Sequence, residues 1–118
     1  RRCGAEVHAC PNAKFTWLMT EAERTEARQH NTAALRAALD TPFDLLVLDE
    51  ACAACRHQLV DEALLRQAAA MAKQGREVVL TGRDPAPWMQ EAADYSTELR
   101  AVRHPYTQGI PAREGIEY

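Results

Sequence analysis

The sequence is short of glycine, of aromatic side chains and of long apolar runs, and these shortages restrict what the chain can be. No apolar stretch approaches the roughly 20 residues that a membrane-spanning helix needs. The net charge is −3, so the chain has no basic excess of the kind that binds nucleic acid or an anionic membrane. The five glycines are isolated from one another and form no glycine-rich loop for a phosphate group. With 47% hydrophobic and 26% charged residues, the composition is that of a water-soluble globular protein.

The length of 118 residues predicts one small domain with a single core. The chain begins at Arg1 without an initiator methionine, which favours the hypothesis that an upstream part was removed or never included. No secretory signal is recognised, so the expected location is the cytoplasm.

Four cysteines are present, and two chemistries are open to them. Cys52 and Cys55 have the spacing of half a zinc site, with Cys3 and Cys10 as the other half. Against zinc, Cys3 and Cys10 are seven residues apart, and the other pair lies in an alanine-rich helical stretch. Buried or idle free thiols are therefore the favoured interpretation.

Residues 44–50, which read Asp-Leu-Leu-Val-Leu-Asp-Glu, are the most informative stretch of the chain. Their short apolar run predicts a strand buried on both faces, as in a parallel sheet covered by helices. Asp49 and Glu50 follow at its C-terminal end, where open α/β sheets place their ligands. A strand that ends in Asp-Glu is the Walker B pattern, in which the acids hold Mg²⁺ or orient water. The alternative is an acidic helix N-cap.

Strands and helices are predicted to alternate along the chain. Thr20 and Glu23 form a capping box for a helix that runs to about Leu39, and Gly75 is suited to end a later helix. Strands are expected at 6–10, 44–50, 77–80 and 95–99, with a short final one near 115–118, and helices at 21–39, 51–57, 62–74 and from Asp84 with Pro85 in its first position. This order predicts an α/β fold with a mostly parallel sheet flanked by helices.

The polar groups that could do chemistry follow the predicted strands. They are Asp49 and Glu50 after one strand, Thr81, Gly82 and Arg83 after another, and the aromatic pair Phe15 and Trp17 after a third. In a parallel sheet these ends share one edge and could line one site, with acids for a metal, a cation for phosphate and an apolar wall. Two simpler interpretations stay open: Arg83 pairs with Asp84 or with another surface acid, and the aromatic pair only staples the next helix to the core.

Taken in order, these motifs resemble a known family. The series is Lys-Phe-Thr-Trp at 14–17, Asp-Leu-Leu-Val-Leu-Asp-Glu at 44–50, Val-Leu-Thr-Gly-Arg at 79–83, Ala-Asp-Tyr-Ser-Thr-Glu-Leu at 93–99, Arg-His-Pro-Tyr at 103–106 and Gly-Ile-Glu-Tyr at 115–118. It is similar to the P-loop type of ATP:corrinoid adenosyltransferase, also called cob(I)alamin adenosyltransferase. The resemblance covers nearly the whole chain from Lys14 onward.

The resemblance implies a P-loop NTPase-like (RecA-like) core and a cytoplasmic enzyme, commonly a homodimer. Such an enzyme transfers the 5′-deoxyadenosyl group of ATP to the cobalt of a reduced corrinoid with Mg²⁺, and a flavodoxin-like protein can serve as electron donor. By motif match, Phe15 and Trp17 would help to remove the lower axial ligand of cobalt. Asp49 and Glu50 would lie at Mg²⁺, and the residues 81–83 would lie near the nucleotide.

The chain departs from the family pattern in one large respect. The family begins with a strand and a Gly-x-Gly-Lys-Gly-Lys-Thr-Thr phosphate loop, which this sequence lacks. The favoured hypothesis is that residues 1–118 are the C-terminal part, roughly two-thirds, of such a domain and are inactive alone. The alternatives are a natural short chain that binds corrinoid without catalysis, and a small α/β interaction domain with an optional cysteine-rich metal site.

Overall fold

The computed structural model describes residues 4–9 and 18–115. The first helix, α1 (Glu21–Asp40), has the predicted capping box at its start. The backbone N–H of Glu23 donates to Thr20 Oγ1 at 3.2 Å, and that of Thr20 donates to Glu23 Oε2 at 2.8 Å. The helix ends at Asp40, two residues before Pro42, which cannot donate a helical hydrogen bond.

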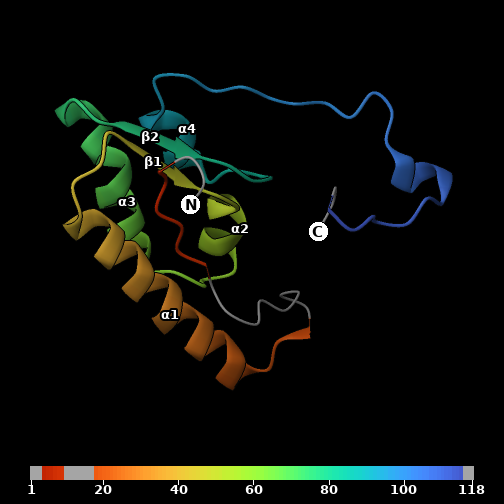
Figure 1. Ribbon diagram of the computed structural model, residues 1–118, viewed down its shortest axis with the longest axis horizontal. Helices are drawn as coiled ribbons and strands as arrows, with labels where there is room; N and C mark the ends of the chain where they lie inside the picture. The colour runs from red at the N-terminus through yellow and green to blue at the C-terminus, as the bar shows by residue number, and fades with distance from the viewer. Residues whose placement is uncertain (1–3, 10–17, 116–118) are drawn as a thin grey trace.

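Two short parallel strands follow, β1 (Leu45–Leu48) and β2 (Glu77–Leu80). The connection between them contains α2 (Ala51–Arg56), α3 (Glu62–Ala70) and the 3₁₀ turn η2 (Met71–Gln74) (Figure 1). Gly75 ends this connection in the left-handed conformation, at φ 81°, as its position predicted. The prediction of an α/β fold with parallel strands is therefore confirmed, for a sheet that has two strands within 4–9 and 18–115.

The core lies on one face of this sheet. Its buried side chains come from α1, α2, the loop before α3, α3 and α4 (Pro87–Ala92), and α1 packs alongside α3 (Figure 1). The buried members are Leu35, Ala51, Cys52, Val60, Leu65, Ala68 and Met89. Leu46, Leu48 and Leu80 of the two strands pack against this cluster, which fixes the strand ends relative to α2.

The other face of the sheet is open, and the prediction of a strand buried on both faces is wrong for the described residues. Leu45 and Val47 are 56% and 54% exposed, and Val79 of β2 is 42% exposed. Strict alternation along β1 and β2 places every second side chain on this open face. An unbroken apolar run predicts that other elements pack on both faces of the strand. The described elements pack on only one face.

Two other predicted strands are absent from the described residues. Residues 6–9 are irregular, and so is 95–99, where Tyr95 and Leu99 are 94% and 93% exposed. β-Propensity alone does not make a strand, because backbone N–H and C=O groups need a partner strand. The final strand predicted near 115–118 lies almost entirely outside the described residues.

The start of α4 was also predicted wrongly. The helix begins at Pro87 with Ala86 as its N-cap, rather than with Asp84 and Pro85. Asp84 has φ 51°, a left-handed conformation instead of the extended one that a helix N-cap adopts. Its carboxylate accepts a hydrogen bond from Arg56 at 2.7 Å, so it joins the loop to α2 and does not cap a helix.

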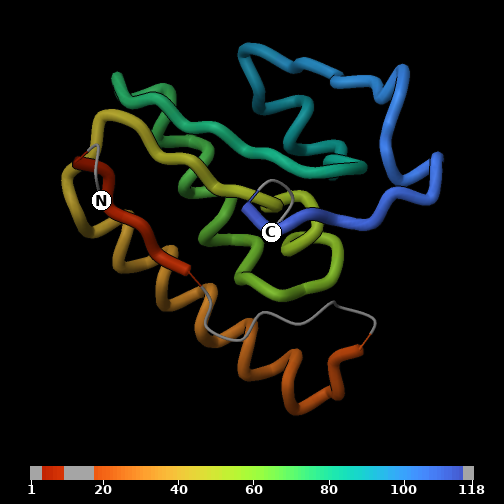
Figure 2. The backbone as a smooth tube through the Cα atoms, turned by 45° about the vertical axis from the view of Figure 1, so that its right-hand side comes forward, coloured from red at the N-terminus to blue at the C-terminus, as the bar shows by residue number. Residues whose placement is uncertain are grey.

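After α4 the chain runs along the periphery of the molecule to the 3₁₀ turn η3 (Pro105–Gln108) (Figures 1 and 2). Val102 is 98% exposed and Tyr106 79% exposed. In the described part, no helix is both long and apolar enough to cross a membrane.

Candidate functional site

The carboxyl end of β1 forms an acidic loop, Asp49–Glu50, directly before α2. Glu50 occupies the N-cap position of α2 with φ 54°, a left-handed conformation that costs a non-glycine residue free energy. Its carboxylate makes no capping hydrogen bond, so the interpretation of the pair as a simple helix cap does not describe Glu50. The side chain is exposed and available to a ligand at the edge of the sheet.

Thr81, the first residue after β2, holds this acidic loop in place. Its hydroxyl donates to Asp49 Oδ1 at 2.6 Å and accepts from the backbone N–H of Glu50 at 3.0 Å. Its backbone carbonyl accepts from the N–H of Cys52 at 3.2 Å. The predicted meeting of the two strand ends is therefore confirmed, and Thr81 is the residue that joins them.

Gly82 brings the loop after β2 into direct contact with α2. Its φ of 134° is unfavourable for any residue with a side chain. A Cβ atom at this position would lie 2.7 Å from the Cβ of Cys52 and 3.2 Å from its Sγ. The glycine is therefore required both by the backbone conformation and by the close approach to Cys52.

Arg83 is exposed after this tight contact, on the same loop. The suggested salt bridge between Arg83 and Asp84 is not what the structure contains, because Asp84 pairs with Arg56. No ion pair of Arg83 occurs within 4–9 and 18–115, so its exposed guanidinium is available to an anion.

The thiol of Cys52 is buried and lies against Gly82. Burial raises its pKa above the ordinary value, and the nearby charges of Glu50 and Cys55 raise it further. Cys52 and Cys55 are both free thiols. Cys3 and Cys10 lie outside the described residues, so the four-cysteine zinc hypothesis stays a hypothesis. Within the residues described, no cluster of three or more His, Cys, Asp or Glu side chains could hold a metal.

Phe15 and Trp17, the predicted aromatic wall, also lie outside the described residues. Among the other five predicted site residues, hydrogen bonds join Asp49, Glu50 and Thr81, and Gly82 contacts α2 at Cys52. Arg83 follows Gly82 on the same loop and is exposed.

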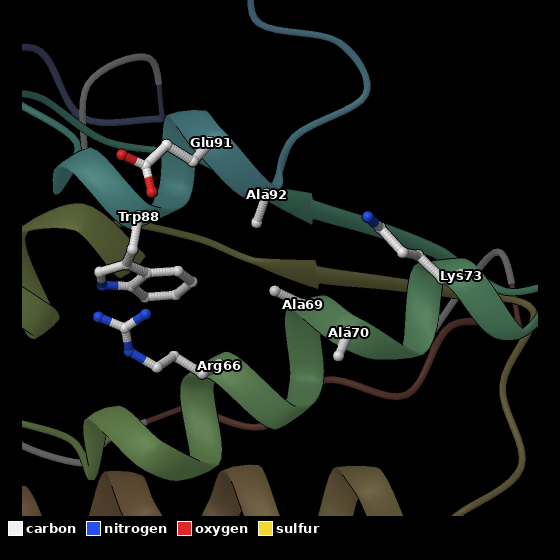
Figure 3. Close-up of a pocket in the computed structure, with 7 residues that line it drawn as sticks. All are labelled: Arg66, Ala69, Ala70, Lys73, Trp88, Glu91 and Ala92. Carbon is white, nitrogen blue, oxygen red and sulfur yellow. The ribbon is translucent and has the colours of Figure 1, made fainter.

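A second feature had no sequence signal. α3, η2 and α4 line an open hollow of about 390 Å³ (Figure 3). The guanidinium of Arg66 lies 4.4 Å from the centre of the Trp88 ring and is also bonded to Glu62. The contact joins residues 22 positions apart, so no local pattern could have predicted it.

The fold and this edge define a class of protein: an α/β protein whose parallel strands present carboxylates, a glycine and a cation at their carboxyl ends, where such sheets bind ligands. Within that class, the family model described as ATP:corrinoid adenosyltransferase BtuR/CobO/CobP matches residues 1–118. The chain belongs to this family of transferases. The family resemblance inferred from the sequence motifs is therefore confirmed.

Curated relatives support the same assignment. The chain is 37% identical over 108 residues to a corrinoid adenosyltransferase of Pseudomonas aeruginosa, 31% over 107 residues to one of Sinorhizobium and 30% over 112 residues to one of Escherichia coli. Each match covers 88% of this chain but 50–54% of the relative, so the chain spans about half the length of these proteins. No solved structure gives a significant match.

Proposed function

We propose that this chain is part of an enzyme that transfers the 5′-deoxyadenosyl group of ATP to the cobalt of a reduced corrinoid. The single observation that carries this is the loop at the end of β1, where Thr81 bonds the carboxylate of Asp49 and the backbone N–H of Glu50, two residues before the exposed Arg83. Family membership supplies the reaction class. We further propose a P-loop NTPase-like core, a cytoplasmic location, a homodimer and a flavodoxin-like electron donor.

The acidic loop fits Mg²⁺, which the reaction would require alongside ATP. Asp49 Oδ1 accepts the Thr81 hydroxyl, which leaves Oδ2 for a cation, and the Glu50 carboxylate is exposed beside it. Mg²⁺ in nucleotide sites is commonly held by one or two carboxylates together with phosphate oxygens, and a third protein ligand is not required. The bound ion would neutralise the charge of the triphosphate.

The reaction requires the protein to position two substrates, ATP and the reduced corrinoid. The lone pair of Co(I) attacks the ribose C5′ carbon, a cobalt–carbon bond forms, the C5′–O bond breaks and triphosphate leaves with that electron pair. Arg83 would bind the departing phosphates, and Gly82 would allow them to approach the backbone closely. Phe15 and Trp17 would exclude a donor ligand from the lower face of cobalt.

Phosphate binding is the function that this chain is least equipped to perform. All five of its glycines are isolated, so it has no glycine-rich amide cradle for the triphosphate. We propose that residues 1–118 are one part of a P-loop adenosyltransferase domain and that adenosylation needs a phosphate loop from outside this chain.

The test is an anaerobic adenosylation assay with ATP, Mg²⁺ and chemically reduced cobalamin. It uses a fusion of this chain to the unmatched half of the P. aeruginosa relative. The fusion should form the cobalt–carbon product, seen in the visible spectrum, and Glu50→Gln should lower the rate at least about tenfold.

The matched control is Glu26→Gln, which removes an exposed carboxylate from α1, away from the loop. It should leave the rate unchanged. A Glu50→Gln rate equal to that of the control would remove Glu50 from the site. A folded fusion that binds ATP and corrinoid without forming product would favour non-catalytic corrinoid binding.

A further inference from the structure

The two thiols of α2 are the reactive groups that the proposed chemistry leaves unused. The helix reads Ala-Cys-Ala-Ala-Cys-Arg over 51–56, so Cys52 and Cys55 form a Cys-x-x-Cys pattern. Both are free thiols. They follow β1 directly, inside the connection between two parallel strands. In that setting the pattern is typical of a redox-active thiol pair.

Helix geometry places the two cysteines close enough to bond to each other. Residues three positions apart on an α-helix have Cα atoms roughly 5 Å apart, within the separation of about 4.4–6.8 Å that disulfides span. Cys52 belongs to the buried core cluster and Cys55 packs against the same cluster, so both side chains lie on one side of α2. The two residues between them are alanines, so no bulky side chain of α2 separates the sulfur atoms.

The two thiols differ in their access to solvent. Cys52 is 5% exposed and lies against Gly82, where a Cβ atom would be 3.2 Å from its Sγ. Cys55 is partly exposed. A dissolved reagent therefore reaches Cys55 first, whereas Cys52 is accessible mainly from within the protein.

We propose that Cys52 and Cys55 form a reversible disulfide within α2 by exchange with a small disulfide such as oxidised glutathione. The Cys55 thiolate attacks one sulfur of the small disulfide, whose S–S bond breaks and releases one thiolate. The sulfur of Cys52 then attacks the Cys55 sulfur of this mixed disulfide and releases the second thiolate. The pair loses two electrons and two protons, and the small disulfide is reduced to two thiols. This modification goes beyond the proposed function, which uses neither thiol.

The pair contacts the candidate site directly. The backbone N–H of Cys52 donates to the carbonyl of Thr81 at 3.2 Å, and Thr81 in turn holds the acidic loop. A disulfide would constrain the helical turn that makes this contact. Zinc is a poorer use of the pair, because a structural zinc site needs four ligands and the described residues contain no group of three candidates.

The test uses the whole 118-residue chain with Cys3→Ser and Cys10→Ser, so that only the pair on α2 can react. Oxidised glutathione is added in the absence of oxygen, and the free thiols and the intact mass are then measured. We expect both thiols to disappear with the loss of two hydrogen atoms and without bound glutathione. Two thiols that stay free would overturn the proposal, and so would a glutathione adduct that persists.

Single variants in the same background test the order of the two steps. Cys52→Ala should keep one glutathione on Cys55, because no second thiol can displace it. Cys55→Ala should react with glutathione at least tenfold more slowly, because its remaining thiol is buried. Equal rates for the two variants would overturn the assignment of Cys55 as the attacking thiol.

The contribution of the folded helix is measured in glutathione redox buffers. The equilibrium constant for the disulfide should be at least tenfold larger in the folded chain than in urea, because α2 holds the two sulfur atoms together. Equal constants would overturn the inference. Circular dichroism verifies folding, and the fusion to the P. aeruginosa segment replaces the chain if the chain alone does not fold. Adenosylation is not the readout, so a failure of the proposed reaction would leave this result unchanged.

Discussion

At the scale of single residues, the site depends on how Thr81 uses its hydroxyl group. The hydroxyl proton goes to Asp49 and one lone pair accepts the N–H of Glu50, so the group is committed within the protein. Thr81 was predicted to contact the nucleotide. The contacts that it makes give it a role in positioning the acidic loop, and direct nucleotide binding remains a proposal.

Gly82→Ala should destabilise the chain more than Gly75→Ala does. Both glycines have positive φ, which costs a substituted alanine roughly 1–2 kcal/mol. At Gly75 a Cβ atom meets nothing within 4 Å, whereas at Gly82 it meets Cys52 at 2.7 Å. Overpacking of this kind adds about 1–3 kcal/mol. Urea unfolding of both variants measures the difference, and equal losses would contradict the close contact.

The raised pKa of the Cys52 thiol predicts a loss of stability at alkaline pH. Burial favours the neutral thiol in the folded state, so the unfolded chain loses this proton first as the pH rises. The contribution of this thiol to the free energy of unfolding should therefore be constant well below the ordinary thiol pKa of roughly 8.5 and fall as the pH rises above it.

The Cys52→Ala variant should show a smaller fall over that range, measured as the urea midpoint at each pH. Cys55→Ala keeps the buried thiol and should retain most of the decline, because burial is the largest cause of the raised pKa and the charge of Cys55 a smaller one. If the urea midpoint of the unmodified chain and that of Cys52→Ala changed in parallel with pH, this thiol would have the same pKa in the folded and unfolded states.

At the scale of secondary structure, the long helix and the short strands have different sources of stability. α1 carries its own start signal in Thr20 and Glu23, and Leu35 is its one buried residue among those described. β1 and β2 are four residues each and depend on each other and on the core beneath them. Local sequence therefore decides where α1 begins, and packing decides whether the strands persist.

Removing the cap of α1 by Thr20→Ala should lower the free energy of unfolding by about 1 kcal/mol, because the N–H of Glu23 loses its acceptor. Thr25→Ala is the control. Thr25 lies inside the same helix, and its hydroxyl donates a hydrogen bond to the backbone carbonyl of Glu21. A hydrogen bond of this kind adds little to the stability of a helix. Thermal unfolding should separate the two variants, and similar midpoints would argue against the capping box as a source of stability.

At the scale of the whole molecule, the chain is less compact than its length predicts. The radius of gyration is 15.6 Å, against about 13.5 Å for a compact domain of 118 residues. The segment after α4 contributes to this, because Tyr95, Leu99 and Val102 are almost fully exposed. Together with the open sheet face, this segment is consistent with a chain that spans half of its relatives.

The role proposed for Trp17 can be tested only in an assembly that completes the active site. In the fusion with the P. aeruginosa segment, Trp17→Ala should reduce adenosylation of cob(II)alamin much more than adenosylation of chemically reduced cob(I)alamin. Loss of the axial ligand makes Co(II) easier to reduce, and Co(I) has no need of that step. Equal losses with both substrates would exclude this role.

The sequence by itself determined the features whose causes lie within a few residues: the start of α1 at its capping box, the stop at Gly75, the two apolar strands and the acidic pair after β1. It also identified the family, because several motifs in a fixed order are specific together even though each one alone is weak.

Only the tertiary structure decided the features that need distant partners. Strand formation was predicted at 95–99 from composition, but a strand needs a neighbour to bond, and the described chain offers none there. The bond between Thr81 and Asp49 spans 32 positions, and the face of β1 left open depends on which helices lie beneath it. Contacts of this kind have no local signal, because their free energy exists only once the chain has brought its elements together.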